Sequence, residues 1–528
     1  MNHFLSSIRS ARFLCSLILL AIAFILLAIP AFMFGGVTWD ELFDFEGVNG
    51  AFWHGINSLK GLNPDLSTIT FDLEYFGNAT RWPTYLLWRL LATSPWESFA
   101  GLSRTATILS GSYIGLNHLN AAVFGFLGIV LTSLIGHRLG GRKLAFLSAV
   151  FILILPTWLG HSWMNSKDIP FASSYLMYTY GSLLMLAPAT GRSYTDLRGA
   201  SFVFRLLGIG LLLGSRVGSI AFVVVSESVY LLLLKRAYLR AVISLCFGVL
   251  FGFLLTPQAW RNPIGYPIEA IQFIGNRQTS TSPFHTLSYI AFHLYESLPF
   301  LLVIGLVAAL SSWPCIPSLR KKTLAWLPVI MQFLIAPALL IIGSKGIYNE
   351  LRHILFIYPP LCLFSAAGWL HVYRHFSVRD SSPRIALVCG CSLALLLAVE
   401  NIALSPYQYI YRSDLARILT PGEPIHRDYW GFSVRESIAR CLKDKECKTL
   451  FSDDAIELRK EDWNSDLFDG LRELLRPPGA ESAKPFSSAF QLQISPSRDA
   501  CSSVVETTRT VLFPVPTRQL VSRIASCS

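Results

Sequence analysis

Apolar runs long enough to cross a lipid bilayer recur along most of the chain. The first, at residues 14–33, reads LCSLILLAIAFILLAIPAFM and is long enough to span a hydrocarbon core of about 30 Å. A cleaved signal peptide is the competing interpretation, which the length of the run and the lack of a clean small-residue cleavage site disfavour. Ten further runs lie near 117–136, 144–160, 169–189, 201–215, 217–234, 239–256, 287–310, 323–343, 354–371 and 384–404.

The charge content agrees with a membrane protein. Charged residues make up 15% of the 528 residues and hydrophobic residues 52%, whereas soluble domains carry about 25% charged residues. The sequence therefore predicts an all-α polytopic membrane protein with about eleven transmembrane helices. The apolar stretch from 201 to 234 is divided at GSRVGS, because a single helix would run about 51 Å and would bury an arginine in the bilayer.

The distribution of basic residues predicts the orientation. Loops assigned to one side carry fourteen Lys and Arg residues, and the short loops of the other side carry six. By the positive-inside rule the N-terminus is cytoplasmic and the C-terminus extracytoplasmic. The net charge of +11 is then mainly a topology signal and needs no nucleic-acid partner.

Two segments are too long to be simple connectors. Residues 34–116 form a large extracytoplasmic loop, in which RWPTYLLWRLLATSPWESFAGL has the pattern of interfacial helices. Residues 405–528 form a C-terminal extracytoplasmic domain, which follows a transmembrane domain at 1–404. Its four cysteines have three possible pairings, of which Cys441–Cys447 and Cys501–Cys527 are favoured over the others and over a zinc site.

Polar residues gather at the predicted extracytoplasmic ends of the spans. Acidic residues follow the first span in GGVTWDELFDFEG, and further loops read LGHSWMNSKDIPFA, GSRVGS and GSKGIYNELRHILFIYPPL. Charged groups at a bilayer face favour a functional site. The candidates are Asp40, Glu41, His161, Asn165, Lys167, Asp168, Arg216, Lys345, Arg352 and His353.

Several of these residues have plain structural alternatives. Asp168 suits the N-cap of the fourth span, which Pro170 would then start. His161 and Lys167 can anchor helix ends at the interface, and Arg352 and His353 can extend toward water. Asp44 and Glu46 are interpreted as solvated or structural, whereas Asp40 and Glu41 are harder to explain without a function.

The mixture of groups fits transfer from a phosphate-linked sugar better than hydrolysis. Lys and Arg side chains neutralise a leaving phosphate, so one carboxylate is enough to take the proton from the attacking hydroxyl. A glycosidase would need two carboxylates flanking the bond.

The order of motifs resembles that of the GT-C membrane glycosyltransferases, closest to the bacterial members of family 39, which are related to the dolichyl-phosphate-mannose protein mannosyltransferases. The motifs are WDEL (39–42), HLNAAVFGFLGI (118–129), GHSWMNSKDIPFA (160–172), GSRVGS (214–219), ELRHILFIYPPL (350–361), PYQYIY (406–411) and DYWGFSVRES (428–437). The chain departs from the family pattern at Ser166, where a proline is usual.

The resemblance implies specific roles. Asp40 is the expected general base, and Glu41 would orient the acceptor or help to bind a divalent metal, although no cofactor is required. The donor would be a polyprenyl-phosphate sugar. From the chemistry of their side chains, Lys167, Arg216, Lys345, Arg352 and His353 are expected to bind its phosphate, and His161, Asn165 and Asp168 to bind substrate. The compact loops and the resemblance together imply a multi-pass plasma (inner) membrane protein. The acceptor would be a glycan, a lipid or a protein, and the reaction would invert the anomeric centre.

Two other classes of function compete with this interpretation. A transporter or flippase of lipid-linked sugar precursors would often show paired halves with broken helices at mid-bilayer, and no internal repeat is visible here. A catalytically silent scaffold would tolerate changes at Asp40 but not in the tail.

Overall fold

The computed structural model describes seventeen stretches of the chain, one of which is formed by the adjacent residues 432 and 433. These are residues 11–36, 38–60, 77–92, 112–186, 194–233, 238–260, 262–277, 281–312, 323–343, 352–378, 383–420, 432, 433, 436, 440, 490–493, 502–511 and 517–526. The cysteines of the predicted disulfides, Cys441, Cys447, Cys501 and Cys527, lie outside these residues, as does Lys345.

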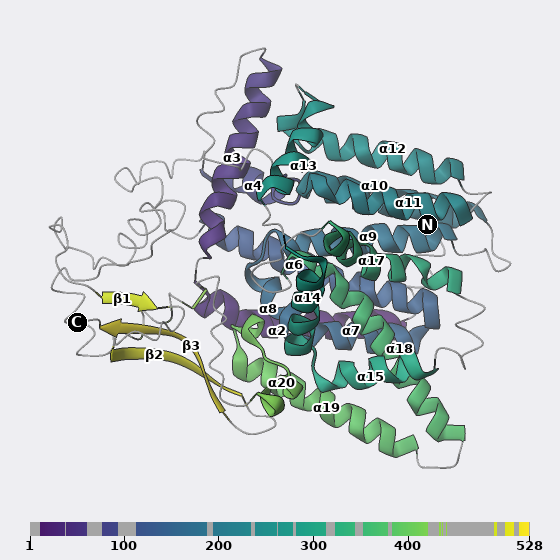
Figure 1. Ribbon diagram of the computed structural model, residues 1–528, viewed down its shortest axis with the longest axis vertical. Coiled ribbons are helices and arrows are strands. Elements are labelled where there is room, and N and C mark those ends of the chain that lie inside the picture. Colours follow the sequence, from purple (N-terminus) through teal and green to yellow (C-terminus); the bar gives the residue numbers. More distant parts are fainter. Residues whose placement is uncertain are drawn as a thin grey trace.

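Most of the described helices run side by side and form one bundle (Figure 1). They are α2 (Ala11–Phe34), α6 (Ser112–Gly140), α7 (Arg142–Leu153), α8 (Pro156–Met164), α9 (Asp168–Leu186), α10 (Tyr194–Ser215), α11 (Ile220–Leu233), α12 (Tyr238–Leu254), α15 (Phe300–Ser312), α17 (Thr323–Ile342), α18 (Tyr358–Val378) and α19 (Pro383–Leu404). Helix α9 is central, since nearly all of its side chains are buried and it packs against α6, α10 and α17.

Each predicted span coincides with a helix or a bent helix pair. Within the described ranges, five helices are long and apolar enough to cross a membrane, and the number rises to seven if two bent pairs each count as one span. The other predicted spans coincide with α9 and with shorter apolar helices in α10, α11 and α12. The polytopic all-α membrane architecture is confirmed. Among the described residues, fewer than the eleven predicted spans are single helices that are long and apolar enough to cross a bilayer.

Two of the predicted spans are broken where proline interrupts the backbone hydrogen bonding. The run at 144–160 divides into α7 and α8, which are bent by 64° before Pro156. The run at 287–310 is not one straight helix. The chain bends by 119° between α14 (Pro283–Ser297) and α15, next to Pro299. The second break turns α14 across the end of the bundle.

A buried ion pair joins four helices inside the bundle. The Arg205 guanidinium on α10 donates to Glu227 Oε1 on α11 at 2.7 Å, to Ser182 on α9 at 2.7 Å and to Ser244 on α12 at 2.8 Å. Tyr178 also donates to the Glu227 carboxylate at 2.5 Å. The division of residues 201–234 into two helices thus places an arginine and a glutamate opposite each other.

Further elements lie at one end of the bundle. They are α3 (Trp39–Leu59), α4 (Trp82–Ala92), η4 (Val217–Ser219), η5 (Pro257–Ala259), α13 (Gly265–Arg277), η7 (Arg352–Ile357), η8 (Gln408–Ile410) and α20 (Asp414–Leu419). Helix α4 exposes Leu86, Leu87 and Leu90, as the predicted interfacial helix requires. The predicted remainder of that segment lies outside the described residues.

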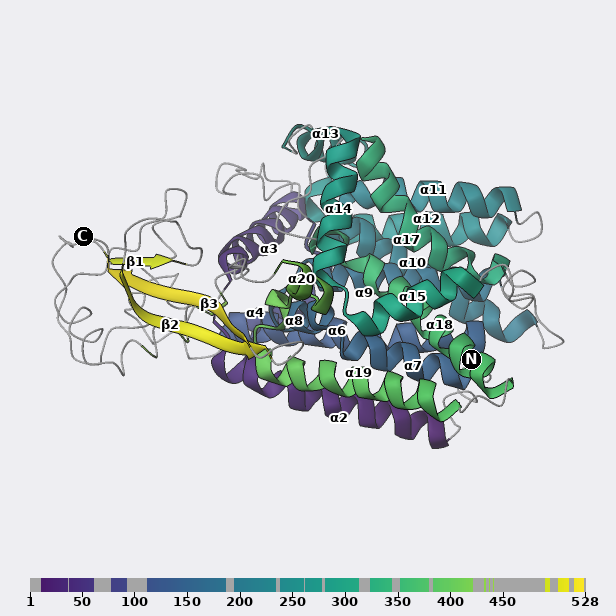
Figure 2. The same cartoon turned by 60° about the horizontal axis from the view of Figure 1, so that its bottom comes forward.

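A small antiparallel sheet stands beyond the same end of the bundle as α3 (Figure 2). Its strands are β1 (Phe490–Gln493), β2 (Ser502–Val511) and β3 (Thr517–Ser526), in the order β1-β3-β2. The chain before the sheet stays with the helices, since Ser413 N–H donates to the carbonyl of Glu296 at 2.6 Å. The domain boundary at 404 therefore remains a prediction.

Close packing of α8 against η8 gives a first testable expectation. A Cβ atom at Gly160 would lie 2.1 Å from the backbone nitrogen of Tyr409. We expect Gly160→Ala to lower the free energy of unfolding by about 1–3 kcal/mol, as overpacking does. Thermal unfolding in detergent measures the effect, with Gly199→Ala on α10 as control, because nothing lies within 4 Å of a Cβ there. Equal melting of the two variants would contradict the close contact.

Candidate functional site

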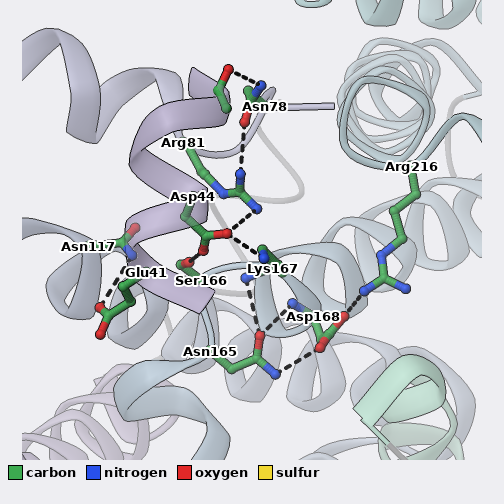
Figure 3. Close-up of polar contacts among 11 residues, drawn as sticks. Glu41, Asp44, Asn78, Arg81, Asn117, Asn165, Ser166, Lys167, Asp168 and Arg216 are labelled. Carbon is green, nitrogen blue, oxygen red and sulfur yellow. Dashed lines mark hydrogen bonds and ion pairs between the residues drawn. The ribbon is translucent and has the colours of Figure 1, made fainter. Parts of the chain in front are cut away.

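The candidate site lies where four segments meet at the end of the bundle that carries α3. These are the first turns of α3, the segment 77–81, the α8–α9 junction and the end of α10 (Figure 3). Figure 3 shows a connected run of charged and amide side chains from Asn78 through Asp44 to Arg216, with the pair of Glu41 and Asn117 beside it. The sequence analysis assigned these segments to the same side of the membrane, and the structure brings them into contact.

Glu41 is buried at the start of α3. Its Oε2 accepts from the backbone N–H of Thr38 at 2.7 Å, so the carboxylate helps to cap the helix. Its Oε1 lies 2.9 Å from His118 Nε2 and 3.5 Å from Asn117 Nδ2, both on α6. Glu41 thereby connects α3, the acidic helix, to α6.

Asp44 is the centre of a charged cluster that it forms with Arg81 and Lys167. Its Oδ1 lies 2.5 Å from Lys167 Nζ and 3.3 Å from an Arg81 nitrogen. Its Oδ2 accepts from the Ser166 hydroxyl at 2.8 Å. The carboxylate is 2% exposed, so the interpretation as solvated is wrong, although a structural role agrees with these contacts.

Arg81 is held in place by its own loop. Asn78 Oδ1 accepts from Arg81 at 2.8 Å, and Asn78 Nδ2 donates to the carbonyl of Gly47 on α3 at 3.1 Å. Ala79 N–H donates to the carbonyl of Gly214 at 3.0 Å. The segment is thus fixed between α3 and the end of α10.

Asn165 organises the turn between α8 and α9. Its Oδ1 accepts from the backbone N–H groups of Lys167 at 3.2 Å and Asp168 at 2.8 Å. Its Nδ2 lies 3.0 Å from Asp168 Oδ2 and 3.2 Å from His161 Nδ1. The side chain that caps α9 is therefore Asn165, which leaves the Asp168 carboxylate to face the site.

Asp168 forms an ion pair with Arg216 across the site. The Arg216 guanidinium also lies 5.3 Å from the Phe171 ring centre and 3.4 Å from His353 Nδ1. Arg352 Nε in turn lies 3.4 Å from His353 Nε2. Arg216 and Arg352 consequently belong to one connected group with His353.

The structure joins most of the residues that the sequence singled out. Side-chain contacts link Asn165, Asp168, Arg216, His353, Arg352 and His161. Lys167 joins them to Asp44, through its backbone N–H to Asn165 and its ammonium to the Asp44 carboxylate. The side chain of Asp40 lies outside the described residues, although its backbone is in the first turn of α3. Sequence reasoning missed Asp44 and Arg81; the three-residue spacing from Glu41 was the available signal for Asp44, since it puts both carboxylates on one helix face.

The described residues around Glu41 do not form a metal site. Both of its carboxylate oxygens already contact Thr38, Asn117 or His118. Within the described ranges, no group of three or more His, Cys, Asp or Glu side chains is arranged to hold a metal ion.

The charges at this end of the bundle can receive an anion. The carboxylates Asp44 and Asp168 are almost fully buried, whereas the side chains of Lys167 and Arg216 are 23% and 28% exposed. Each buried carboxylate thus holds one partly exposed cation in position. An oxyanion that reaches the surface would meet the cations before the carboxylates.

Comparison with known proteins supports the fold. No family model matches the chain, and no curated protein sequence matches it. The structure of ArnT from Cupriavidus metallidurans bound to undecaprenyl phosphate is similar at a TM-score of 0.50 and 17% identity, over 88% of this chain and 85% of ArnT. The apo oligosaccharyltransferase of Archaeoglobus fulgidus gives a TM-score of 0.48 and 13% identity, over 91% of this chain and 62% of that protein.

The likeness to ArnT bears on the fold that the sequence predicted. The match to ArnT extends over most of both chains and shows a shared fold. Membership of family 39 remains a prediction, since no family model matches. The chain has the GT-C membrane fold that the order of its motifs predicted.

Proposed function

We propose that the protein is an integral membrane glycosyltransferase. It moves a sugar from a polyprenyl-phosphate-linked donor to an acceptor hydroxyl on the extracytoplasmic face, with inversion at the anomeric carbon. The observation that carries the proposal is the pairing of buried Asp44 and Asp168 with the partly exposed cations Lys167 and Arg216 at one end of the bundle.

The cations are suited to the donor phosphate. When the sugar is transferred, its bond to the phosphate oxygen breaks and the bonding electrons stay with the polyprenyl phosphate. Lys167, Arg216 and Arg352 would stabilise the charge that develops there, with Arg216 offering a planar fork of donors. His353 lies between the two arginines and would help to orient them, and Lys345 is proposed for the same phosphate.

Asp40 is the proposed base, because Asp44 is already committed to its cationic partners. Asp44 contacts Arg81, Lys167 and Ser166, which leaves it poorly placed to accept a proton. Asp40 would take the proton from the acceptor hydroxyl as that oxygen attacks the sugar. Attack from the face opposite the phosphate inverts the anomeric centre. Glu41, together with His161, Asn165 and Asp168, would shape the acceptor side of the site.

Replacement of Asp40 tests this assignment. We expect Asp40→Asn to lower turnover by about 100-fold or more, the usual contribution of a positioned general base. The assay uses purified protein in lipid with radiolabelled polyprenyl-phosphate sugars, one sugar at a time, and crude membrane and cell-wall fractions as acceptors. Release of polyprenyl phosphate is followed.

Glu46→Gln on the same helix is the matched control and should retain turnover. Normal turnover by well-folded Asp40→Asn and Asp40→Ala proteins would remove Asp40 from the role of base. Absence of release by the unaltered protein with every donor would instead favour a transporter of lipid-linked sugars.

The proposed placement follows from the same charges. The N-terminus would be cytoplasmic, and the end of the bundle that carries α3 and the sheet would face the extracytoplasmic side. The donor's lipid would then stay in the bilayer while its head group reaches the cluster around Lys167. The acceptor, a glycan, lipid or protein hydroxyl, would approach from water.

A further inference from the structure

A short segment of the C-terminal tail is inserted beside the acidic helix. Phe432 and Ser433 are fully buried, although almost four hundred residues separate them from α3. The backbone N–H of Gly36 donates to the carbonyl of Phe432 at 2.8 Å. Glu436 accepts from the Tyr407 hydroxyl at 2.7 Å and fastens the same segment to the residues that precede η8.

The Phe432 ring packs against the short connection between α2 and α3. A Cβ atom at Gly35 would lie 2.3 Å from this ring, so only glycine permits the approach. The ring also meets the His118 imidazole edge to face, with centroids 5.6 Å apart. His118 is the group that contacts the Glu41 carboxylate. Phe432 therefore packs against the residues just before α3 and against the histidine that contacts Glu41.

The same ring is linked to the α8–α9 junction through tyrosines at η8. Tyr407 and Tyr409 lie 6.2 Å and 6.4 Å from Phe432, measured between ring centroids. Tyr409 lies 6.2 Å from His161, whose Nδ1 is 3.2 Å from Asn165. Asn165 sets the turn that presents Lys167 and Asp168.

Phe432 thus contacts the supports of both halves of the charged cluster. The halves meet at the contact between Asp44 on α3 and Lys167 on the turn, which is 2.5 Å long. Aromatic side chains bury much area and lose little rotational freedom, so a single ring can hold two backbones at a fixed separation. Loss of the ring would leave a cavity between them.

We propose that Phe432 is a positioning residue, which sets the distance between the acidic helix and the cationic α8–α9 turn for sugar transfer. It acts through Gly36, His118 and Tyr409 and does not touch the reacting atoms. The inference rests on the proposed function, and it gives the tail segment a part in the chemistry.

The first test separates positioning from general stability. We expect Phe432→Ala to lower kcat by about 10- to 100-fold, the size of effect that a small misplacement of reacting groups produces. The KM for the lipid-linked donor should change little, and Phe432→Leu, which refills most of the cavity, should restore most of kcat. All rates are measured at a temperature at which each protein is fully folded.

The matched control removes another packed aromatic ring. Phe364 on α18 stacks on Trp326, with ring centroids 5.5 Å apart, and also meets Phe333; both partners are on α17. Phe364→Ala should lower the melting temperature and leave kcat unchanged. Equal losses of kcat in Phe364→Ala and Phe432→Ala, or an unchanged kcat in Phe432→Ala, would overturn the proposal.

A second readout does not depend on activity. Thr38, at the start of α3, is fully buried. We expect a Thr38→Cys side chain to be protected from a water-soluble maleimide in the parent and in Phe364→Ala, and to react faster in Phe432→Ala, with labelling read by peptide mass spectrometry. Equal protection in all three proteins would overturn the proposal, even if no donor proved active and the proposed function failed.

Discussion

Replacement of Asp44 by asparagine is expected to impair both folding and sugar transfer. The carboxylate balances Lys167 and Arg81 in a buried position, and the Asp44→Asn protein would leave both cations without it. Removing one partner of a buried ion pair costs about 3–5 kcal/mol. Turnover per folded molecule should fall by about 100-fold, because Lys167 would lose the contact that fixes it toward the donor phosphate.

A double substitution shows whether the charge is the cause. Lys167→Met combined with Asp44→Asn should be less destabilising than the sum of the single changes, since fewer charges remain uncompensated. The free energy of unfolding in mixed micelles and the release of polyprenyl phosphate measure the two effects. Additive losses of stability, or normal turnover by Asp44→Asn, would contradict the central position of Asp44.

The second large effect is expected inside the bundle. Glu227→Gln or Arg205→Met alone should lower the free energy of unfolding by about 3–5 kcal/mol, because each leaves a charge in an apolar interior. Arg205 is 1% exposed and reaches three helices besides its own, so it cannot turn toward water. Expression level and unfolding in detergent provide the measurement.

This ion pair stands apart from the candidate site, which predicts a clean separation of effects. The folded fraction of each single variant should transfer sugar at nearly the parental rate. Arg205→Met combined with Glu227→Leu should recover stability relative to either single change, since no charge is then left alone. A stable Glu227→Gln protein would show that the pair contributes little.

The sequence was sufficient to locate the apolar helices of the bundle, since a bilayer-spanning helix needs a long apolar run, but it did not locate α3 or α13. It was also sufficient to place Lys167, Asp168 and Arg216 on one face, because basic loops fix the orientation. The breaks at Pro156 and Pro299 were missed as changes of direction. Proline marks where a helix is weakened, but neighbouring helices decide the angle, which is 64° in one case and 119° in the other.

The roles within the acidic motif were harder to predict. Four carboxylates lie close together in the sequence, and the contacts of Glu41 and Asp44 depend on the neighbours that the fold brings to α3. Asp44 faces Lys167 because the segment 77–81 and the α8–α9 turn converge on that side. Asn165 was expected to bind substrate, yet its carboxamide also caps α9, a role that depends on where the helix begins.

The backbone contact between Gly36 and Phe432 has a consequence for biosynthesis. The chain emerges from the ribosome N-terminus first, so Gly36 is made long before Phe432, whose carbonyl accepts its hydrogen bond. The surroundings of His118 and Tyr409 are completed only after the last predicted span has been inserted and the tail has followed it. A nascent or prematurely terminated chain lacks this ring, so the candidate site matures as one of the final steps of assembly.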